Sequence, residues 1–198
     1  MTRQNGEQHL NEPELIQQLR QGDEPAFRWL VDNYRDRVFH TVLNIVQDTD
    51  DAEDASQETF IQVFESVGQF KQESSLSTWI YRIAVHKALD KIRRRKTRQR
   101  LRQILPWWMP EEKKSAGPSF QHPGIDLEHK EKAATLFGAI QSLSSNQRIA
   151  FTLIKVQGMS YDEAAAIMNQ SIKSIESLIS RAKANLQKQL EYYYKSLK

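Results

Sequence analysis

Two runs of opposite charge stand out among the side chains that could bind a ligand. Between residues 44 and 67 the chain carries seven acidic side chains and no basic one. Residues 91–102 reverse the sign, with eight lysines and arginines and no acid, a density suited to neutralising the phosphates of a nucleic acid. We therefore expect the molecule to present two oppositely charged faces. The acidic residues are Asp48, Asp50, Asp51, Glu53, Asp54, Glu58 and Glu65.

The acidic run is also compatible with an enzymatic function. Asp50, Asp51 and Asp54 could hold Mg²⁺ in a nuclease, while the basic run positions the nucleic acid. Against this, the sequence offers no second set of ligands and no poised base, and acids on successive helical turns are common on protein surfaces. The chain has no cysteine, which excludes thiolate metal sites and thiol nucleophiles. We expect a protein that performs no catalysis and needs no metal or cofactor, with the nuclease as an alternative.

A helix, a tight polar turn and a second helix near the end of the chain predict a DNA-binding unit. The turn is expected at residues 169–171. In such a unit the second helix exposes its N-terminal half to base edges in the major groove. An ordinary helical hairpin with a solvated polar face is the alternative. The exposed residues, which can contact phosphates or bases, are Ser171, Lys173, Ser174, Ser177 and Arg181, and the inner apolar residues are Ile172, Ile175, Leu178, Ile179, Ala182 and Leu186.

Apolar side chains at three- and four-residue steps place both charged runs on helices. With only seven glycines and six prolines, the composition also favours an all-α fold over an all-β one. Four helices are predicted in the first half of the chain. The first ends before Gly22, the second runs to about Gln47, the third spans residues 52–67, and the fourth runs from Leu76 into the basic run.

Proline and glycine mark a boundary between two parts of the chain. Four of the six prolines fall in an aperiodic segment, which we interpret as a flexible linker over residues 98–129. The predicted architecture is therefore two small helical domains, over residues 8–97 and 130–195. The first ten residues are polar, and no apolar run approaches the length of a membrane span. We expect a cytoplasmic protein with no direct membrane insertion.

Four motifs follow one another in an order that resembles a known family. They are Asp51-Ala-Glu-Asp54-Ala-Ser-Gln57-Glu58, Ser77-Thr-Trp79-Ile-Tyr81-Arg82-Ile-Ala, Gln147-Arg148 and Gly158-Met-Ser-Tyr161-Asp-Glu163-Ala-Ala. The succession resembles the extracytoplasmic-function (ECF) sigma factors of bacterial RNA polymerase, within the sigma-70 superfamily. The resemblance covers nearly the whole chain, with region 2 in the first domain and region 4 in the second. It implies a factor that directs the RNA polymerase core enzyme to promoters by recognising their −35 and −10 elements and helping to open the DNA.

The resemblance implies two binding surfaces in region 2. The third helix binds the clamp helices of the largest polymerase subunit, through positions that match Asp51, Asp54, Gln57 and Glu58. The fourth helix and the loop before it recognise and melt the −10 element. Tyr81 is the stronger candidate for stacking on a base, because a tryptophan at the place of Trp79 is more often buried in a core. The implied −10 contacts are Lys71, Trp79, Tyr81, Arg82, His86, Lys87, Lys91, Arg94 and Arg95.

In region 4 the resemblance places the second helix of the helix-turn-helix in the major groove of the −35 element, which implies the same exposed residues as the motif itself. Region 4 of the family also contacts the flap of the second-largest polymerase subunit. Family members are often held inactive by an anti-sigma factor, which makes such a protein an expected partner besides core polymerase and promoter DNA. Leu76 and His86 stand where Phe and Asn are usual, so details of base selection could differ. A free-standing helix-turn-helix regulator that never engages polymerase remains the alternative.

Overall fold

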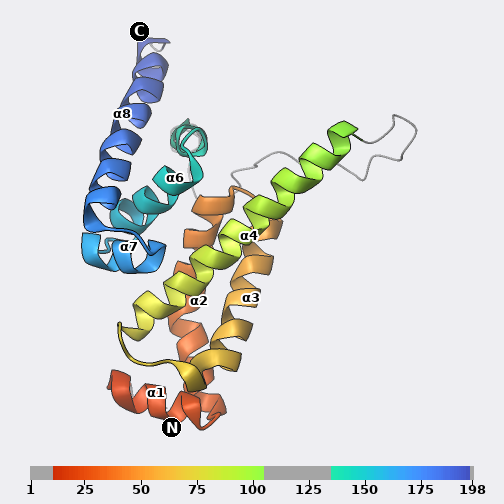
Figure 1. The fold of residues 1–198 in the computed structure, drawn as a ribbon, viewed down its shortest axis with the longest axis vertical. Helices are drawn as coiled ribbons and strands as arrows, with labels where there is room; N and C mark the ends of the chain where they lie inside the picture. Colours follow the sequence, from red (N-terminus) through yellow and green to blue (C-terminus); the bar gives the residue numbers. More distant parts are fainter. Residues whose placement is uncertain (1–10, 105–134, 197–198) are drawn as a thin grey trace, which may run out of the picture.

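The computed structural model describes residues 11–104 and 135–196, and every regular element within these ranges is a helix (Figure 1). The all-α fold predicted from composition and periodicity is confirmed. Within these ranges no helix has both the length and the apolar composition that crossing a bilayer requires. Of the predicted linker, residues 98–104 continue the helix that precedes it, and residues 105–129 lie outside the described residues.

Four α-helices build the first domain. They are α1 (Glu12–Arg20), α2 (Glu24–Val46), α3 (Thr49–Ser66) and α4 (Leu76–Ile104), with a short 3-10 turn η1 (Val67–Gln69) after α3. Aspartates start α2 and α3: the Asp23 carboxylate accepts the backbone N–H of Ala26 at 2.9 Å, and the Asp48 carboxylate accepts that of Asp51 at 3.0 Å. Gln47 ends α2 in a left-handed conformation with φ of 60°.

The loop between η1 and α4 is tied to α1 at both of its ends. Arg20 donates a hydrogen bond to the carbonyl of Phe70, and Oε1 of Glu12 accepts the backbone N–H of Leu76 at 2.8 Å. The Phe70 ring also stacks on Trp79, with ring centroids 4.8 Å apart. These contacts fix where α4 begins relative to the rest of the first domain.

The second domain consists of a helical segment at residues 135–141 and four named elements: α6 (Ser145–Phe151), η2 (Thr152–Val156), α7 (Tyr161–Met168) and α8 (Ile172–Ser196). A complete capping box starts α7. The backbone N–H of Glu163 donates to Oγ of Ser160 at 3.1 Å, and the Glu163 carboxylate accepts the backbone N–H of Ser160 at 2.8 Å. The segment before α7 contains η2, a wider π-helical turn in which the N–H of Gln157 donates to the carbonyl of Thr152 at 2.9 Å.

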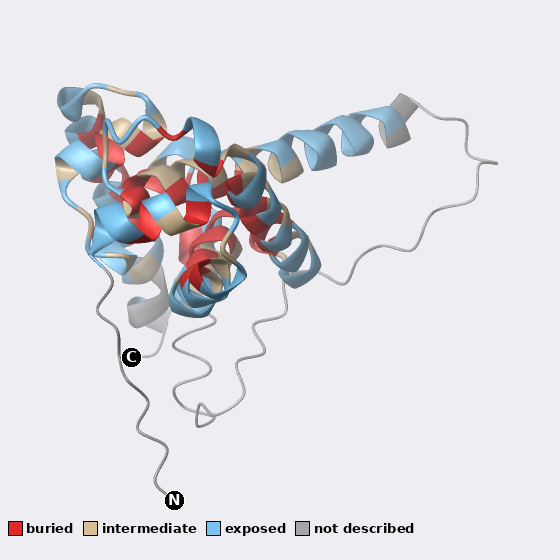
Figure 2. Cartoon of the chain, turned by 90° about the horizontal axis from the view of Figure 1, so that it is seen from below, coloured by how far each residue is buried: buried red, intermediate tan, exposed pale blue. Residues whose placement is uncertain are grey.

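The two domains pack directly against each other. α7 lies against α4, and both α6 and η2 lie against α2. Buried residues lie in the interior, where helices face one another (Figure 2), and one continuous cluster of buried apolar side chains includes members of both domains. A smaller cluster joins the helical segment at residues 135–141 to α8. Consequently, the second domain covers part of the helix that carries the predicted −10 contacts.

Candidate nucleic-acid and partner-binding surfaces

The start of α8 is built to present polar groups to solvent. Asn169 turns the chain after α7 in a left-handed conformation with φ of 50°. Oγ of Ser171 then caps α8 by accepting the backbone N–H of Ser174 at 3.3 Å. Lys173 is exposed on the first turn, beside free backbone N–H groups that favour a phosphate. This part of the helix can therefore hold a nucleic-acid backbone.

One turn further along α8, Ser177 and Arg181 form a pre-arranged pair. Nη2 of Arg181 donates to Oγ of Ser177 at 2.7 Å, and both side chains are exposed as predicted. Ser174 is only half-exposed, because its hydroxyl donates to Oε1 of Gln170 at 2.7 Å. Ile172, predicted on the inner face, is 42% exposed, since it lies at the helix start, ahead of the first buried position. The predicted exposed face of α8 is therefore present, except that Ser174 is only half-exposed.

The acidic side chains of α3 and the basic side chains of α4 meet in the middle of the first domain, which corrects the expectation of two separate charged faces. Nζ of Lys91 lies 3.0 Å from Oε1 of Glu58 and 3.3 Å from Oδ2 of Asp54. Lys87 lies 3.9 Å from the other oxygen of Glu58. Burial of the Lys91 ammonium lowers its pKa, but the bonds to Glu58 and Asp54 outweigh burial, and the pKa is raised overall.

Arg95 joins the ends of two helices. Its Nη2 lies 2.8 Å from the Asp48 carboxylate and 3.0 Å from that of Asp51, at the start of α3. Its Nη1 donates to the carbonyl of Val46, at the end of α2, at 3.4 Å. A cation at a helix C-terminus is favourable because the last carbonyl groups carry partial negative charge. Arg95 thus has a structural role in addition to any contact with DNA.

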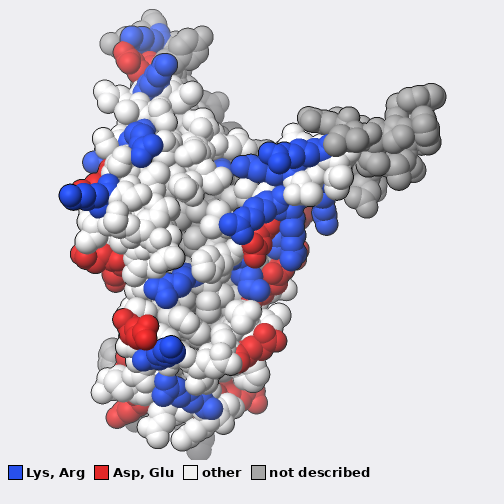
Figure 3. All heavy atoms as spheres, viewed as in Figure 1, with Lys and Arg blue, Asp and Glu red and all other residues white. Residues whose placement is uncertain are grey.

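The remainder of the basic run projects away from the acids. Arg94, Lys96, Arg98 and Arg100 are exposed, and no carboxylate of the described residues lies within ion-pair distance of them. Figure 3 shows Lys and Arg side chains along the projecting end of α4, with acidic side chains close to its base. This end of the helix keeps the positive charge that suits a phosphate backbone.

Tyr81 is fully buried, so the prediction of an exposed stacking ring is wrong for this arrangement. Its exposed fraction is 0%, and its hydroxyl lies 3.4 Å from Oε1 of Gln157 in the second domain. Burial raises the pKa of Tyr81, and the Arg37 guanidinium, 5.9 Å from the ring centroid, partly opposes that rise. Trp79, expected in the core, is the half-buried ring instead. The contact with Gln157 shows that the second domain lies against Tyr81, whereas Trp79 stacks on Phe70 of the first domain.

The other predicted −10 positions fall into two groups. Lys71 and His86 are exposed, on the loop before α4 and on α4 itself. Arg82 is half-buried, and its Nε donates to the carbonyl of Ala166 in α7 at 3.1 Å. The structure therefore leaves some of the predicted contacts open, while others are engaged in contacts within the chain.

An exposed stripe on α3 combines acidic and apolar residues. The Asp54 side chain is 68% exposed despite its bond to Lys91, and Gln57 is exposed. Ile61 and Phe64, which continue the same stripe at steps of four and three residues, are 57% and 55% exposed. Of the other two predicted positions on α3, Asp51 and Glu58 are half-exposed.

Sequence reasoning missed these apolar residues as surface candidates. Phe64 follows the helical periodicity of the core, so the pattern predicts its burial, yet its side chain is exposed, with its ring in a T-shaped arrangement with that of Phe27 at a centroid distance of 5.1 Å. The spacing of Ile61 and Phe64 from Gln57 is the signal that could have identified them.

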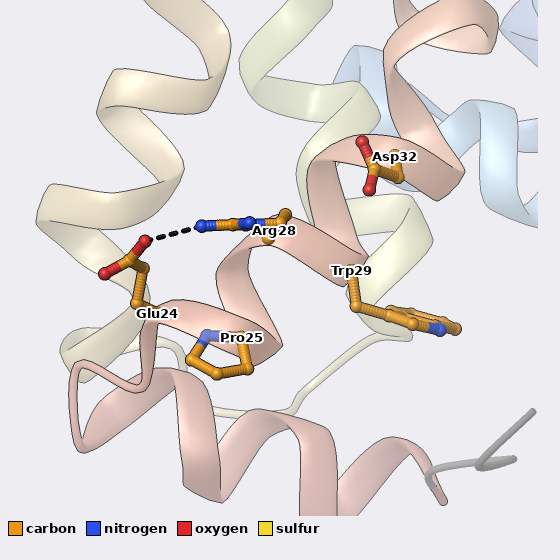
Figure 4. A pocket seen from close by; sticks show the side chains of 5 residues that line it. All are labelled: Glu24, Pro25, Arg28, Trp29 and Asp32. Carbon is orange, nitrogen blue, oxygen red and sulfur yellow. Dashed lines mark hydrogen bonds and ion pairs between the residues drawn. The ribbon is translucent and has the colours of Figure 1, made fainter. Parts of the chain in front are cut away.

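A hollow in the described part of the chain lies apart from these surfaces. This hollow, on α2, is lined by Glu24, Pro25, Arg28, Trp29 and Asp32, and in it Glu24 and Arg28 form an ion pair of 2.7 Å (Figure 4). None of these residues belongs to a predicted site. Among the residues that the structure describes, no group of three or more His, Cys, Asp or Glu side chains could hold a metal ion.

Two family models match the chain in order. The one described as Sigma-70 region 2 matches residues 30–98, and the one described as Sigma-70, region 4 matches residues 135–186. The RNA polymerase sigma-H factor of Pseudomonas aeruginosa is 30% identical over 189 residues, which cover 90% of this chain and 93% of that protein. The chain belongs to the sigma-70 family. The resemblance inferred from the ordered motifs is therefore confirmed.

Further relatives and solved structures agree with this family. The ECF RNA polymerase sigma-E factor of Escherichia coli K12 is 30% identical over 178 residues, covering 89% of this chain and 92% of its own. The sigma factor RpoE of Bartonella quintana, solved with the anti-sigma factor NepR, has a TM-score of 0.65 and 26% identity over 83% of this chain and 96% of its own. CnrH, solved with the cytosolic domain of CnrY, shares the fold, with a TM-score of 0.67 and 22% identity over 91% of this chain and 97% of its own.

The predicted sites fall within the two sigma-70 regions. All the positions on α3, α4 and the loop between them lie inside the match to region 2, and those on α8 lie inside the match to region 4. α1 precedes the matched part of region 2, although it anchors the loop before α4 through Glu12 and Arg20. In this sigma-70 protein, regions 2 and 4 are thus helical units in mutual contact.

Proposed function

We propose that this chain is a transcription initiation factor that binds core RNA polymerase and directs it to specific promoters without catalysing a reaction. One observation supports the proposal: a chain matched by regions 2 and 4 exposes both the polar start of the second helix of a helix-turn-helix and a mixed acidic and apolar helix face. Relatives named RNA polymerase sigma factors, similar along most of the chain, support it. Such a factor acts in the cytoplasm, where the chromosome and polymerase are.

We assign the −35 element to α8. Lys173 and Arg181 lie on the exposed face of its first three turns, at a spacing that brings both to one side of the helix. A helix in the major groove uses such cations for phosphates or guanine, and hydroxyls such as that of Ser177 for either partner. The capped helix start adds backbone N–H groups for a phosphate.

We assign the −10 element to α4 and the loop that precedes it. Exposed cations, among them Arg94, Lys96 and Arg98, follow the projecting part of α4, where they can track the phosphates of a separated strand. Lys71 extends the positive charge to the loop, and Trp79 offers a half-buried ring beside it. Melted DNA can thus lie along one edge of region 2.

The partner of α3 in this proposal is the pair of clamp helices in the largest polymerase subunit. A partner complementary to the α3 stripe would be basic at one end and apolar at the other, because the stripe consists of Asp54, Gln57, Ile61 and Phe64. Charge complementarity speeds the encounter, while burial of the two apolar side chains slows dissociation. Region 4 would contact the flap of the second-largest subunit near the exposed Lys155.

Control by an anti-sigma factor is part of the same proposal. The Bartonella quintana RpoE, which is 26% identical to this chain, was solved bound to the anti-sigma factor NepR. A similar arrangement of helices here gives a regulator the same kind of surfaces to cover. No residue of this chain identifies the regulator.

Reconstituted transcription tests the function. The purified chain is added to core polymerase with a library of random promoter sequences, and transcripts are sequenced. We expect transcripts to start from a restricted set of promoters that share −35 and −10 elements, only when both proteins are present. Core polymerase that starts equally well without the chain would contradict the proposal.

A charge-reversal variant tests the docking surface. Asp54→Arg should weaken association with core polymerase and the transcription that depends on it. Asp32→Arg is the matched control, since it makes the same change at an exposed position on α2. A free-standing helix-turn-helix regulator would instead bind duplex promoter DNA without core enzyme, and its binding would not respond to Asp54→Arg.

A further inference from the structure

The loop between η1 and α4 lies between two buried apolar residues. Phe70 before it and Leu76 after it are 5% and 1% exposed. The five residues between them, at 71–75, are polar, and all are exposed except Ser74, which is half-exposed. The loop therefore offers a short row of polar side chains to solvent, between two points that are fixed in the core.

α1 holds the backbone at both of these points. Arg20, the last residue of α1, donates a hydrogen bond to the carbonyl of Phe70. Glu12, the first residue of α1, accepts the N–H of Leu76 on Oε1 at 2.8 Å. The two bonds join residues 50 and 64 positions apart, so they fix the loop against a helix that is remote from it along the chain.

The bond to Glu12 is not needed to start α4. Oγ of Ser75 already accepts the backbone N–H of Thr78 at 3.1 Å, which is the ordinary cap of a helix start. The carboxylate of Glu12 satisfies one further N–H that no carbonyl of the same helix reaches, at an end where negative charge is favourable. Glu12 is therefore a second cap supplied by another helix, and what it adds is the position of the end of the loop.

Neighbouring helices contact both ends of the loop. Burial raises the pKa of Tyr34 on α2, the Glu12 carboxylate raises it further, and a side-chain hydrogen bond with Ser77 on α4 opposes the rise. Three helices thus meet at the end of the loop. At its beginning, the ring of Phe70 stacks on Trp79, with centroids 4.8 Å apart. The middle of the loop is open, while its ends are held.

Gln72, in the middle of the loop, has a left-handed backbone conformation with φ of 59°. Residues other than glycine rarely adopt this conformation, and they keep it where the surrounding structure fixes the chain. A loop freed at one end would relax toward the commoner conformations. The two bonds from α1 therefore restrict the directions in which the exposed side chains of the loop can point.

We infer that α1 is a positioning element for −10 recognition: Glu12 and Arg20 hold the loop at residues 71–75 in one conformation, and that conformation sets which −10 bases are preferred. The inference rests on the proposed function of α4 and its loop. α1 lies outside the match to region 2, which begins at residue 30. Specificity is a difference between affinities, and a loop with several conformations contacts correct and incorrect bases more equally. Glu12 and Arg20 act through the loop and do not need to touch DNA.

A promoter library with a fixed −35 element and a randomised −10 element tests the inference. Transcripts made by core polymerase with each full-length variant are sequenced. Glu12→Ala removes the acceptor for the N–H of Leu76, whereas Glu12→Gln keeps an oxygen at that place. We expect Glu12→Ala to reduce discrimination among −10 bases roughly fivefold, at one or two neighbouring positions of the element, and Glu12→Gln to keep most of it.

Glu14→Ala is the matched control, because it removes an exposed carboxylate from the same helix. It should leave the −10 preference unchanged. Affinity for core polymerase and the −35 preference should be unchanged in every variant, since α3 and α8 are not altered. A uniform loss of transcription from all −10 elements in Glu12→Ala, with base preference intact, would overturn the positioning role. So would equal effects of Glu12→Ala and Glu14→Ala.

Arg20→Met tests the other end of the loop independently. It removes the donor to the carbonyl of Phe70 and should reduce −10 discrimination in the same way. Arg35→Met makes the same change at an exposed position of α2 and should have no such effect. Circular dichroism confirms that each variant is folded. If Glu12→Ala does not fold, Arg20→Met decides, and an unchanged −10 preference in that variant would overturn the inference.

Hydrogen exchange at the amide of Leu76, measured by NMR in the free full-length chain, tests the attachment without DNA or polymerase. We expect faster exchange in Glu12→Ala than in the parent, and no difference between the parent and Glu14→Ala. Equal exchange in the parent and Glu12→Ala would overturn the attachment of the loop to α1.

These outcomes are distinct from failure of the proposed function. A chain in which Glu12 protects the Leu76 amide, but which starts no promoter-specific transcription with core polymerase, would refute the sigma-factor function. A promoter-specific chain whose −10 preference does not respond to Glu12→Ala or Arg20→Met would refute the positioning role alone.

Discussion

Nζ of Lys91 lies 3.0 Å from Oε1 of Glu58, and this bond connects the two helices of region 2 that have different proposed partners. Glu58 is on α3, which we assign to polymerase, while Lys91 is on α4, which we assign to DNA. The Lys91 side chain is only 11% exposed, so the ion pair is partly shielded from water. Polymerase binding at α3 or DNA binding at α4 therefore takes place beside a charged side chain that is already paired with the other helix.

Removal of Lys91 should destabilise the first domain modestly. We expect Lys91→Met to lower the free energy of unfolding by about 1 kcal/mol, since the carboxylates on α3 are partly exposed and screened. A double-mutant cycle with Glu58→Gln should return a coupling of about 0.5 kcal/mol or more in urea unfolding. Arg98→Met is the control, because Arg98 is exposed on the same helix. Equal losses from Lys91→Met and Arg98→Met would contradict a structural role for the ion pair.

Tyr81 should make the folded state sensitive to alkaline pH. Burial raises its pKa above the ordinary 10.0, with Arg37 opposing and Tyr34 adding to the rise. A raised pKa means that the folded chain prefers the neutral phenol. The resulting stabilisation is complete below pH 10.0 and is lost as the pH rises through the folded pKa. The ultraviolet absorbance of tyrosinate during an alkaline titration, compared between the parent and Tyr81→Phe, measures this group. A difference spectrum that titrates below the ordinary pKa would refute it.

Ile61 should contribute to polymerase binding and little to stability. Its side chain is 57% exposed, so Ile61→Ser should change the free energy of unfolding by no more than about 0.5 kcal/mol. If the residue is buried against the clamp helices, the same variant should weaken binding to core polymerase about tenfold. Leu101→Ser, at a position 53% exposed on α4, is the matched control. Titration of labelled core polymerase measures the affinity of each variant. Equal affinities for Ile61→Ser and Leu101→Ser would contradict polymerase binding through the α3 stripe.

Lys173 should contribute to the affinity of region 4 for duplex DNA. In complexes with −35 duplexes, Lys173→Ala should lower affinity by roughly tenfold and reduce the slope of log affinity against log salt by about one if the contact is to a phosphate. Lys188→Ala, exposed further along α8, should change both quantities less. Fluorescence anisotropy at several salt concentrations measures them. An unchanged salt slope with altered base preference would instead assign Lys173 to a base.

Side chains near the helix ends determined where most of the helices begin. Asp23 and Asp48 start α2 and α3, and Ser160 with Glu163 starts α7, because their side chains satisfy backbone N–H groups within one turn. The exposed face of α8 follows equally from its periodicity. Such features depend on neighbours three or four residues apart, which a sequence shows directly. The π-helical turn η2 was not predicted, since no local pattern distinguishes it from an α-helix.

The burial of Tyr81 and the exposure of Phe64 were decided by tertiary packing. Periodicity placed Phe64 on the apolar face of α3, and the family resemblance made Tyr81 a candidate for stacking on a base, yet Phe64 is exposed and Tyr81 is buried. Similarly, charge counts along the chain predicted separate faces, whereas adjacent helices pair Lys91 with Glu58.

By itself, the sequence determined that the chain is helical, where most helices begin, and which family it belongs to, since motifs and caps are local. Only the tertiary structure decided which side chains are exposed and available to bind a partner. Exposure depends on what packs over a residue, and the element that covers Tyr81 and Arg82 comes from the other domain, more than seventy residues away. No spacing within α4 encodes that contact, because burial is a property of the whole packed molecule.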